Sequence, residues 1–264
     1  MEWIYFLLCG VFAGTMAGLL GVGGGLVVVP VLLAIFNHLG FPSEVLTQMA
    51  IATSLAVMLF TCMGSVHRHH QKGAVDWPLV VNMAIGVSVG AIAGAFLADY
   101  MSGRILQILL GVFVLIAAAQ TFLSLKPKAR KPLPGKAPLA IAGGIMGVIS
   151  GLFGIGTAIM AVPYLLFHNV LMQKAVATAA ACAFPVALFG SIGFIITGLN
   201  HHGTLPAHSF GYIYLPAVVS IVVTSVICAR FGATLAHKLP AHHLKKMFGV
   251  YLVLVGIRLL TAAG

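Results

Sequence analysis

Two glycine-rich stretches hold the residues best suited to bind a ligand. The first, Gly18–Gly25, runs on to Pro30, and the second, Gly151–Gly156, runs on to Pro163. Six positions are shared: Gly18, Leu19, Gly21, Gly23, Val29 and Pro30 recur as Gly151, Leu152, Gly154, Gly156, Val162 and Pro163. Both stretches lie in long apolar runs, where clustered glycines allow a helix to break and expose unpaired N–H groups. Close helix packing through small residues is the alternative explanation of either stretch alone.

A helix that restarts inside an apolar run directs the positive end of its dipole into the protein interior. We predict such restarts near Gly23–Gly25 and near Gly156–Thr157. Two such ends facing each other could hold a small anion without any charged side chain. The predicted substrate contacts are the glycines and nearby polar side chains of both stretches and of the runs that follow them: Gly21, Gly23, Gly24, Gly25, Gly154, Gly156, Thr157, Thr53, Ser54, Thr178 and Gln48.

Two of these hydroxyls occupy corresponding places in the chain. The segment Ala50–Thr53 (AIAT) aligns with Ala175–Thr178 (AVAT), each following a glycine stretch. We therefore favour Thr53 and Thr178 as a pair of ligand contacts. A helical Ser or Thr often bonds the carbonyl four residues earlier, so a structural role is an equal alternative for each.

The composition indicates an integral membrane protein. Of 264 residues, 61% are hydrophobic and only 7% are charged, whereas soluble domains have about 25% charged residues. The net charge of +10 is explained by basic loops beside membrane segments, without a nucleic-acid partner. The N-terminus lacks the pattern of a cleaved signal peptide. The four cysteines are scattered singly, which favours buried reduced thiols over a redox or metal role.

Hydropathy divides the chain into eight apolar blocks, at 3–36, 44–66, 79–98, 104–125, 139–169, 174–199, 209–236 and 243–262. A transmembrane helix needs about 20 residues, so the first and fifth blocks are too long and contain the glycine stretches. We predict an all-α membrane protein, a polytopic helical bundle of two repeated halves. The halves are residues 1–125 and 139–264, joined by a basic, proline-rich linker at 126–138.

The distribution of Lys and Arg predicts the topology. If the two long blocks each cross the membrane once, eight basic residues lie on the linker side and six on the other. If each long block folds back at its glycines, the division becomes twelve against two, with only Arg104 and Arg258 opposite the linker. The folded-back arrangement is therefore favoured. It predicts inverted halves, a cytoplasmic linker and both termini outside.

The sequence gives weaker support to other kinds of functional site. The carboxylates Glu2, Glu44, Asp76 and Asp99 all lie at block edges, so none is placed to relay protons or bind sodium in mid-membrane. The histidines at 67–70 and 201–202 suit a divalent-metal permease, but their spacing fits no particular metal and polar loop histidines are favoured. No nucleophile has a paired base, so we do not expect an enzyme. A membrane sensor or scaffold without flux is a third alternative.

The order of these motifs resembles one transporter family. The run Gly18–Gly25 ending at Pro30, the segment Ala52–Leu55, the repeated Gly-Ala-x-Leu-Ala at 94–98 and 232–236, and the late Gly111 and Gly249 are similar to the sulfite exporter TauE/SafE family, also called the DUF81 or toluene sulfonate uptake permease family. The second half departs from the glycine pattern, with Thr157 and Ala158 in place of Gly24 and Gly25.

The resemblance implies a secondary transporter of the bacterial or archaeal inner membrane. Members are linked to sulfite, sulfonates and sulfoacetate, and no prosthetic group is implied. We therefore expect an exporter of a small sulfur anion that works by alternating access between its two halves. Membrane lipid is the expected surrounding, nucleic acid is not an expected partner, and a homo-oligomer is compatible with the sequence.

Overall fold

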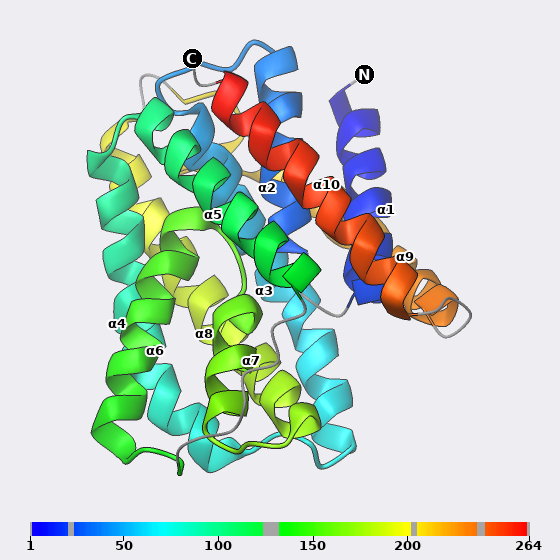
Figure 1. Ribbon diagram of the computed structural model, residues 1–264. Coiled ribbons are helices and arrows are strands. Elements are labelled where there is room, and N and C mark those ends of the chain that lie inside the picture. Colours follow the sequence, from blue (N-terminus) through cyan, green and yellow to red (C-terminus); the bar gives the residue numbers. More distant parts are fainter. Residues whose placement is uncertain (1, 21–23, 124–131, 202–204, 237–240, 263–264) are drawn as a thin grey trace.

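The fold is a bundle of helices, seen in a computed structural model described for residues 2–20, 24–123, 132–201, 205–236 and 241–262. These residues form ten α-helices, one 3₁₀ turn and two short antiparallel strands (Figure 1). The elements are α1 (Glu2–Leu20), α2 (Gly25–His38), α3 (Leu46–Gln71), α4 (Trp77–Tyr100), α5 (Gly103–Leu123), α6 (Lys136–Phe153), α7 (Ala158–Phe167), α8 (Met172–Gly198), η1 (Leu199–His201), β1 (Ser209–Phe210), β2 (Ile213–Tyr214), α9 (Leu215–Ala236) and α10 (Ala241–Ala262).

Five of the described helices are long and apolar enough to cross a membrane: α3, α4, α5, α6 and α8, the last with its 3₁₀ extension. The all-α membrane class predicted from the sequence is confirmed. Helix α3 is the most enclosed of these spans, with 61% of its apolar window buried inside the protein. It packs against α2, α8 and α9, so it lies at the centre of the bundle.

Both long apolar blocks are interrupted, as predicted. The first is divided into α1 and α2, with Leu20 ending one helix and Gly25 beginning the next. The second is divided into α6 and α7, between Phe153 and Ala158. We call residues 154–157 the second break.

The first block folds back on itself. The ring of Tyr5, near the start of α1, lies 5.5 Å from the ring of His38, at the end of α2. The second block also returns, because Leu165 of α7 shares a buried cluster with Leu139 at the start of α6 and Leu79 at the start of α4. In Figure 1 the two blocks enter the bundle from opposite ends.

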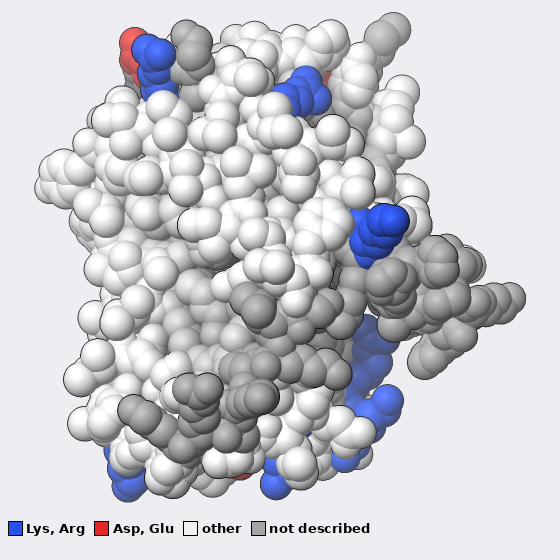
Figure 2. All heavy atoms as spheres, in the orientation of Figure 1, with Lys and Arg blue, Asp and Glu red and all other residues white. Residues whose placement is uncertain are grey.

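Those opposite ends define two faces of the bundle. We call the end with Glu2, His38, Gly103 and Ala262 the terminal face, since the N and C labels lie together there in Figure 1. The end with Gln71, Trp77, Lys136 and Phe167 is called the linker face. In Figure 2 the blue Lys and Arg side chains gather mainly toward the lower, linker face, with less blue at the upper end.

Glycines allow two pairs of parallel helices to pack closely. Helix α4 lies along α6, where a Cβ at Gly86, Gly90 or Gly94 would clash with the α6 backbone. Helix α1 lies along α9, where a Cβ at Gly10 or Gly14 would clash with the α9 backbone. Small residues let membrane helices approach closely enough for backbone contact. These pairs hold α1 and α6, the helices that precede the two interruptions, against continuous helices.

Candidate functional site

The two interrupted blocks meet inside the bundle. A Cβ added to Gly25, the first residue of α2, would lie 2.6 Å from the carbonyl oxygen of Gly154 and 3.0 Å from Cα of Ile155. Only glycine therefore fits at this contact. Gly154 has a φ of 67° and a left-handed conformation that ends α6, which glycine adopts without steric cost. The start of α2 is thus fixed against the second break.

Helices α2 and α7 begin with the same local geometry. The N-cap residues Gly24 and Thr157 have φ and ψ of −71° and −17°, and of −65° and −15°. The carbonyl of Gly24 accepts from the N–H groups of Val27 and Val28, and that of Thr157 accepts from Met160 and Ala161. The first N–H groups of a helix have no acceptor within it, and they carry the positive end of its dipole. Two such ends therefore begin inside the bundle.

Hydrogen bonds to α3 and α8 hold the second break. The Ser54 hydroxyl donates to the carbonyl oxygen of Gly154 at 3.0 Å. At the other end of the break, the Thr157 hydroxyl donates to the carbonyl oxygen of Ala179 at 3.0 Å. Ser54, Thr157 and Gly25 are all buried. The four residues of the break are therefore fixed between the two central helices.

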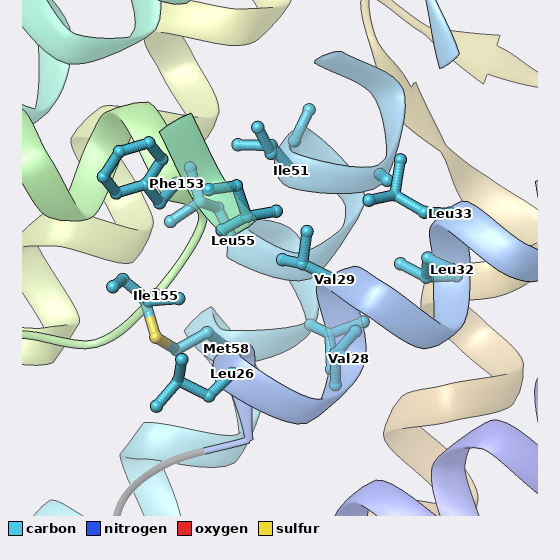
Figure 3. Packing of buried hydrophobic residues seen from close by; sticks show 14 of the residues in the cluster. Leu26, Val28, Val29, Leu32, Leu33, Ile51, Leu55, Met58, Phe153 and Ile155 are labelled. Atoms are coloured by element: carbon cyan, nitrogen blue, oxygen red, sulfur yellow. The ribbon is translucent and has the colours of Figure 1, made fainter. Parts of the chain in front are cut away.

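The side chains packed around the junction are apolar. Figure 3 shows Leu26 of α2, Met58 of α3 and Ile155 of the second break pointing toward one another. Val29 and Leu55 pack beside them. Polar contacts to a ligand here would come from backbone N–H groups and hydroxyls, in surroundings of low dielectric that strengthen such contacts.

The repeated threonines differ in their contacts. The Thr53 hydroxyl accepts a hydrogen bond from the backbone N–H of Tyr214 at 3.1 Å. Thr178 is fully buried, and its hydroxyl has no hydrogen-bond partner in the structure. Ser150, in the last turn of α6, is also fully buried with an unpartnered hydroxyl. Buried polar atoms are rarely left unpaired, so the hydroxyls of Thr178 and Ser150, like that of Ser191 further along α8, are candidates to bond a ligand. Ser150 is absent from the contacts that the sequence predicts.

The structure gathers some of the predicted contacts and separates others. Gly25, Gly154, Gly156, Thr157 and Ser54 lie together at the junction. Gln48 lies apart, near the terminal face, where its side-chain amide donates to the carbonyl oxygens of Ala98 and Met101 at the end of α4. Gly24 precedes α2 at the junction, and Gly21 and Gly23 lie outside the described residues.

The acidic side chains lie away from the junction. The Asp76 carboxylate caps α4 by accepting from the N–H of Leu79, Glu2 accepts from the Tyr214 hydroxyl, and Glu44 precedes α3. Asp99, in the last turn of α4, accepts from the Tyr212 hydroxyl at 2.7 Å. All four carboxylates of the chain are thus at the two faces, so no acidic side chain opposes an anion at the junction.

The histidines form local contacts. His67 and Gln71 bond each other through their side chains, and Trp77 donates to His70. The described residues contain no group of three or more His, Cys, Asp or Glu side chains placed to hold a metal ion. His201 lies 3.6 Å from the Asp99 carboxylate, on the side of the bundle that also contacts Tyr212.

A large cavity opens at the terminal face. It measures about 820 Å³ and lies between α2, α5 and α10, with Tyr5 and the start of α3 at its edge. Both basic residues that the charge count assigns to the side of the termini, Arg104 and Arg258, line it. None of the predicted substrate contacts does. The charge count identified this pair of arginines, but the sequence does not show that their helix ends enclose a cavity.

Interrupted helices in a multi-pass apolar bundle, with their positive ends inside it, define the class of membrane transporter. The profile of the family described as sulfite exporter TauE/SafE matches residues 6–259. The chain belongs to this family. It is a multi-pass membrane transporter and not an enzyme.

Curated relatives extend over almost the whole chain. A probable membrane transporter protein of Haemophilus influenzae is 33% identical over 96% of this chain and 96% of its own length. A probable membrane transporter protein of Methanocaldococcus jannaschii is 27% identical over 96% of this chain and 94% of its own. YunE of Bacillus subtilis, with the same description, is 26% identical over 98% of both chains. No solved structure matches the chain at a significant level.

Proposed function

We propose that this protein is a secondary transporter that exports a small anion, sulfite or an organosulfonate such as sulfoacetate. The single observation that carries the proposal is the contact of Gly25 with Gly154, which brings the start of α2 against the second break. The start of α7 follows that break directly. Backbone N–H groups at two helix starts would then bind one anion, as they do at other phosphate and sulfate sites.

The negative end of a helix dipole also lies at the junction, and it is partly neutralised by hydrogen bonds. Helix α6 also ends at the junction, and its carbonyls carry the negative end of its dipole. Two of these oxygens already accept hydrogen bonds. The Gly154 carbonyl accepts from the Ser54 hydroxyl, and the Ser150 carbonyl accepts from the backbone N–H of Ile155. The unpaired donors at the helix starts, and the unpartnered hydroxyls of Thr178 and Ser150, therefore favour a negatively charged guest.

We further propose that residues 1–125 and 139–264 are inverted repeats joined by a cytoplasmic linker at 126–138. Corresponding features support this: α1 packs along α9 as α6 packs along α4, and Pro30 and Pro163 occupy matching places in α2 and α7. Arg68, Lys72, Lys136 and Lys174 lie toward the linker face, which the positive-inside rule assigns to the cytoplasm. Movement of one half against the other would open the junction alternately to each side.

Flux in liposomes tests the proposal. Purified protein is reconstituted, preloaded with unlabelled sulfite or sulfoacetate, and assayed for counterflow of the labelled anion. The proposal expects saturable counterflow that protein-free liposomes lack, and competition by one or more of a panel of sulfite, sulfoacetate, taurine and sulfate. Counterflow of nickel, cobalt or zinc with none of the sulfur anions would replace this function by metal transport. Absence of flux for every solute would favour a sensor or scaffold.

A further inference from the structure

We propose that the cavity at the terminal face is one end of the transport path, an aqueous entrance that leads along α2 and α3 to the junction. We call this cavity the terminal vestibule. The inference rests on the proposed function, because it takes the junction as the binding site of the transported anion. It adds the route by which that anion enters or leaves on the side of the terminal face.

The terminal vestibule extends well into the bundle. On α10 its lining runs from Ala262, at the end of the helix, back to Tyr251. This stretch of helix is about 16 Å long at 1.5 Å per residue. On α2 the lining runs from His38, also a helix end, back to Pro30, a stretch of about 12 Å. Because the hydrocarbon core of a membrane is about 30 Å thick, the vestibule reaches far below the membrane surface.

One face of α2 connects the vestibule with the junction. Leu33 lines the vestibule, and Leu26 lies at the junction, beside Gly25. Leu26 and Leu33 are two turns apart on the same side of the helix, a distance of about 10 Å. Figure 3 shows Val29 between them, and its side chain is fully buried.

Helix α3, which packs against α2, makes a second connection of the same length. Thr47 lines the vestibule, and Ser54 bonds the Gly154 carbonyl at the junction. These two side chains are also two turns, or about 10 Å, apart on one helical face. Ala50 lies between them and is fully buried. The floor of the vestibule is therefore separated from the junction by a short layer of small apolar side chains, and a movement of α2 against α3 would open it.

The polar groups of the vestibule favour water over lipid as its content. Asn37, Ser43, Gln107 and Arg258 are among the lining residues. Polar side chains on membrane helices usually face the protein interior or a water-filled cavity. The described lining residues include no Asp or Glu, so no acidic side chain repels an anion that enters.

The first test measures whether water reaches the deep wall of the vestibule. V31C on α2 and V255C on α10 place thiols in that wall, each in a C228S background because Cys228 is the cysteine that is not buried. The probe is 2-sulfonatoethyl methanethiosulfonate, a charged reagent that forms a disulfide with a thiolate and releases methanesulfinate. Reaction rates are measured in phosphatidylcholine nanodiscs, where both faces of the protein are accessible.

The matched control is V223C in the same background. Val223 is exposed on the surface of α9, at a similar distance from the terminal face, and does not line the vestibule. We expect V31C and V255C to react about tenfold or more faster than V223C, because the thiolate is the reactive form and a thiol in lipid stays protonated. Rates no faster than that of V223C would overturn the vestibule. Size-exclusion chromatography confirms that each variant is folded, and A34C, in the same wall of α2, replaces V31C if that variant is not.

The second test asks whether the vestibule belongs to the path. Protein is modified at V31C or V255C, freed of reagent and reconstituted for counterflow. We expect the modified proteins to lose the counterflow that the unmodified variants retain, because the added sulfonatoethyl group obstructs the route. Modified protein that transports as fast as unmodified protein would overturn the assignment of the vestibule to the path.

The two measurements separate this inference from the proposed function. Fast labelling of V31C and V255C without flux of any sulfur anion would keep the aqueous vestibule and remove the transporter proposal. Flux of a sulfur anion with slow labelling at both positions would keep the transporter and remove the vestibule.

Discussion

The Ser54 hydroxyl donates a hydrogen bond of 3.0 Å to the carbonyl oxygen of Gly154, one hundred positions further along the chain. This contact ties the central helix α3 to the break between α6 and α7. The same break also contacts Gly25 at the start of α2. Three segments distant in sequence are therefore fixed relative to one another at the junction of the two broken blocks.

Replacing Ser54 by Ala leaves the Gly154 carbonyl without its donor in a buried position. An unsatisfied buried acceptor costs about 1–3 kcal/mol, so S54A should unfold at a lower temperature in detergent and transport more slowly. T61A on the same helix is the matched control, because the Thr61 hydroxyl bonds only the nearby carbonyl of Met58. Equal melting temperatures for S54A and T61A would show that the contact does not hold the break.

Alanine substitutions at two adjacent glycines test whether the protein requires the contact between the start of α2 and the second break. A methyl group at Gly25 would overlap the backbone of Gly154, whereas one at Gly24 has the Val28 side chain as its nearest neighbour at 3.7 Å. Forcing extra volume into a packed interior costs about 1–3 kcal/mol. G25A should therefore lower thermal stability and folded yield, and G24A should not. A G25A protein as stable as G24A would contradict the close approach of the two blocks.

A substitution at Thr178 distinguishes a ligand contact from a structural role for its hydroxyl. Its hydroxyl is buried without a partner, so T178V should keep or raise the stability of the ligand-free protein by about 1 kcal/mol. If the hydroxyl binds the anion, the same variant should raise the KM for transport by about tenfold. T197V is the control on α8, because the Thr197 hydroxyl bonds the Gly193 carbonyl of its own helix. Lower stability with unchanged KM in T178V would assign the hydroxyl a structural role.

The raised pKa of the Tyr212 hydroxyl predicts that the protein loses stability in alkaline solution. Burial and the hydrogen bond to Asp99 raise the pKa of the Tyr212 hydroxyl. A group whose pKa is higher in the folded state binds its proton more tightly there, so its contribution is complete below the unfolded pKa of about 10 and is lost as pH rises above it. Melting temperatures from pH 8 to 11 should fall less steeply for Y212F than for wild type. Y100F, at an exposed position, should follow the wild-type curve, and an identical slope in Y212F would exclude this contribution.

Local features of this fold could be predicted from the sequence. The positions of both interruptions follow from glycines that the backbone requires, such as Gly154 with its positive φ and Gly25 at the helix contact. The return of α2 to the face where α1 starts follows from the uneven distribution of Lys and Arg. These properties depend on residue type and on order along the chain, so a single sequence contains them.

Contacts between distant segments could not be predicted in the same way. Gln48 is a predicted substrate contact, and its side-chain amide bonds carbonyls at the end of α4; a polar residue near a helix start can serve either purpose, and the sequence does not show these bonds. Thr53 and Thr178 look equivalent in sequence but differ in their hydrogen bonds. The cavity at the terminal face lies between the ends of α2, α5 and α10, an arrangement that no local pattern specifies.

The central claim is that the starts of α2 and α7 share one anionic guest. Anomalous diffraction from crystals soaked with the transported sulfur anion, or with its selenium analogue, locates that guest directly. The claim predicts an anomalous peak at hydrogen-bonding distance from the backbone N–H groups of Gly25 and Ala158, near Thr178. A peak confined to surface arginines, or a cation in place of the anion at this junction, would contradict it.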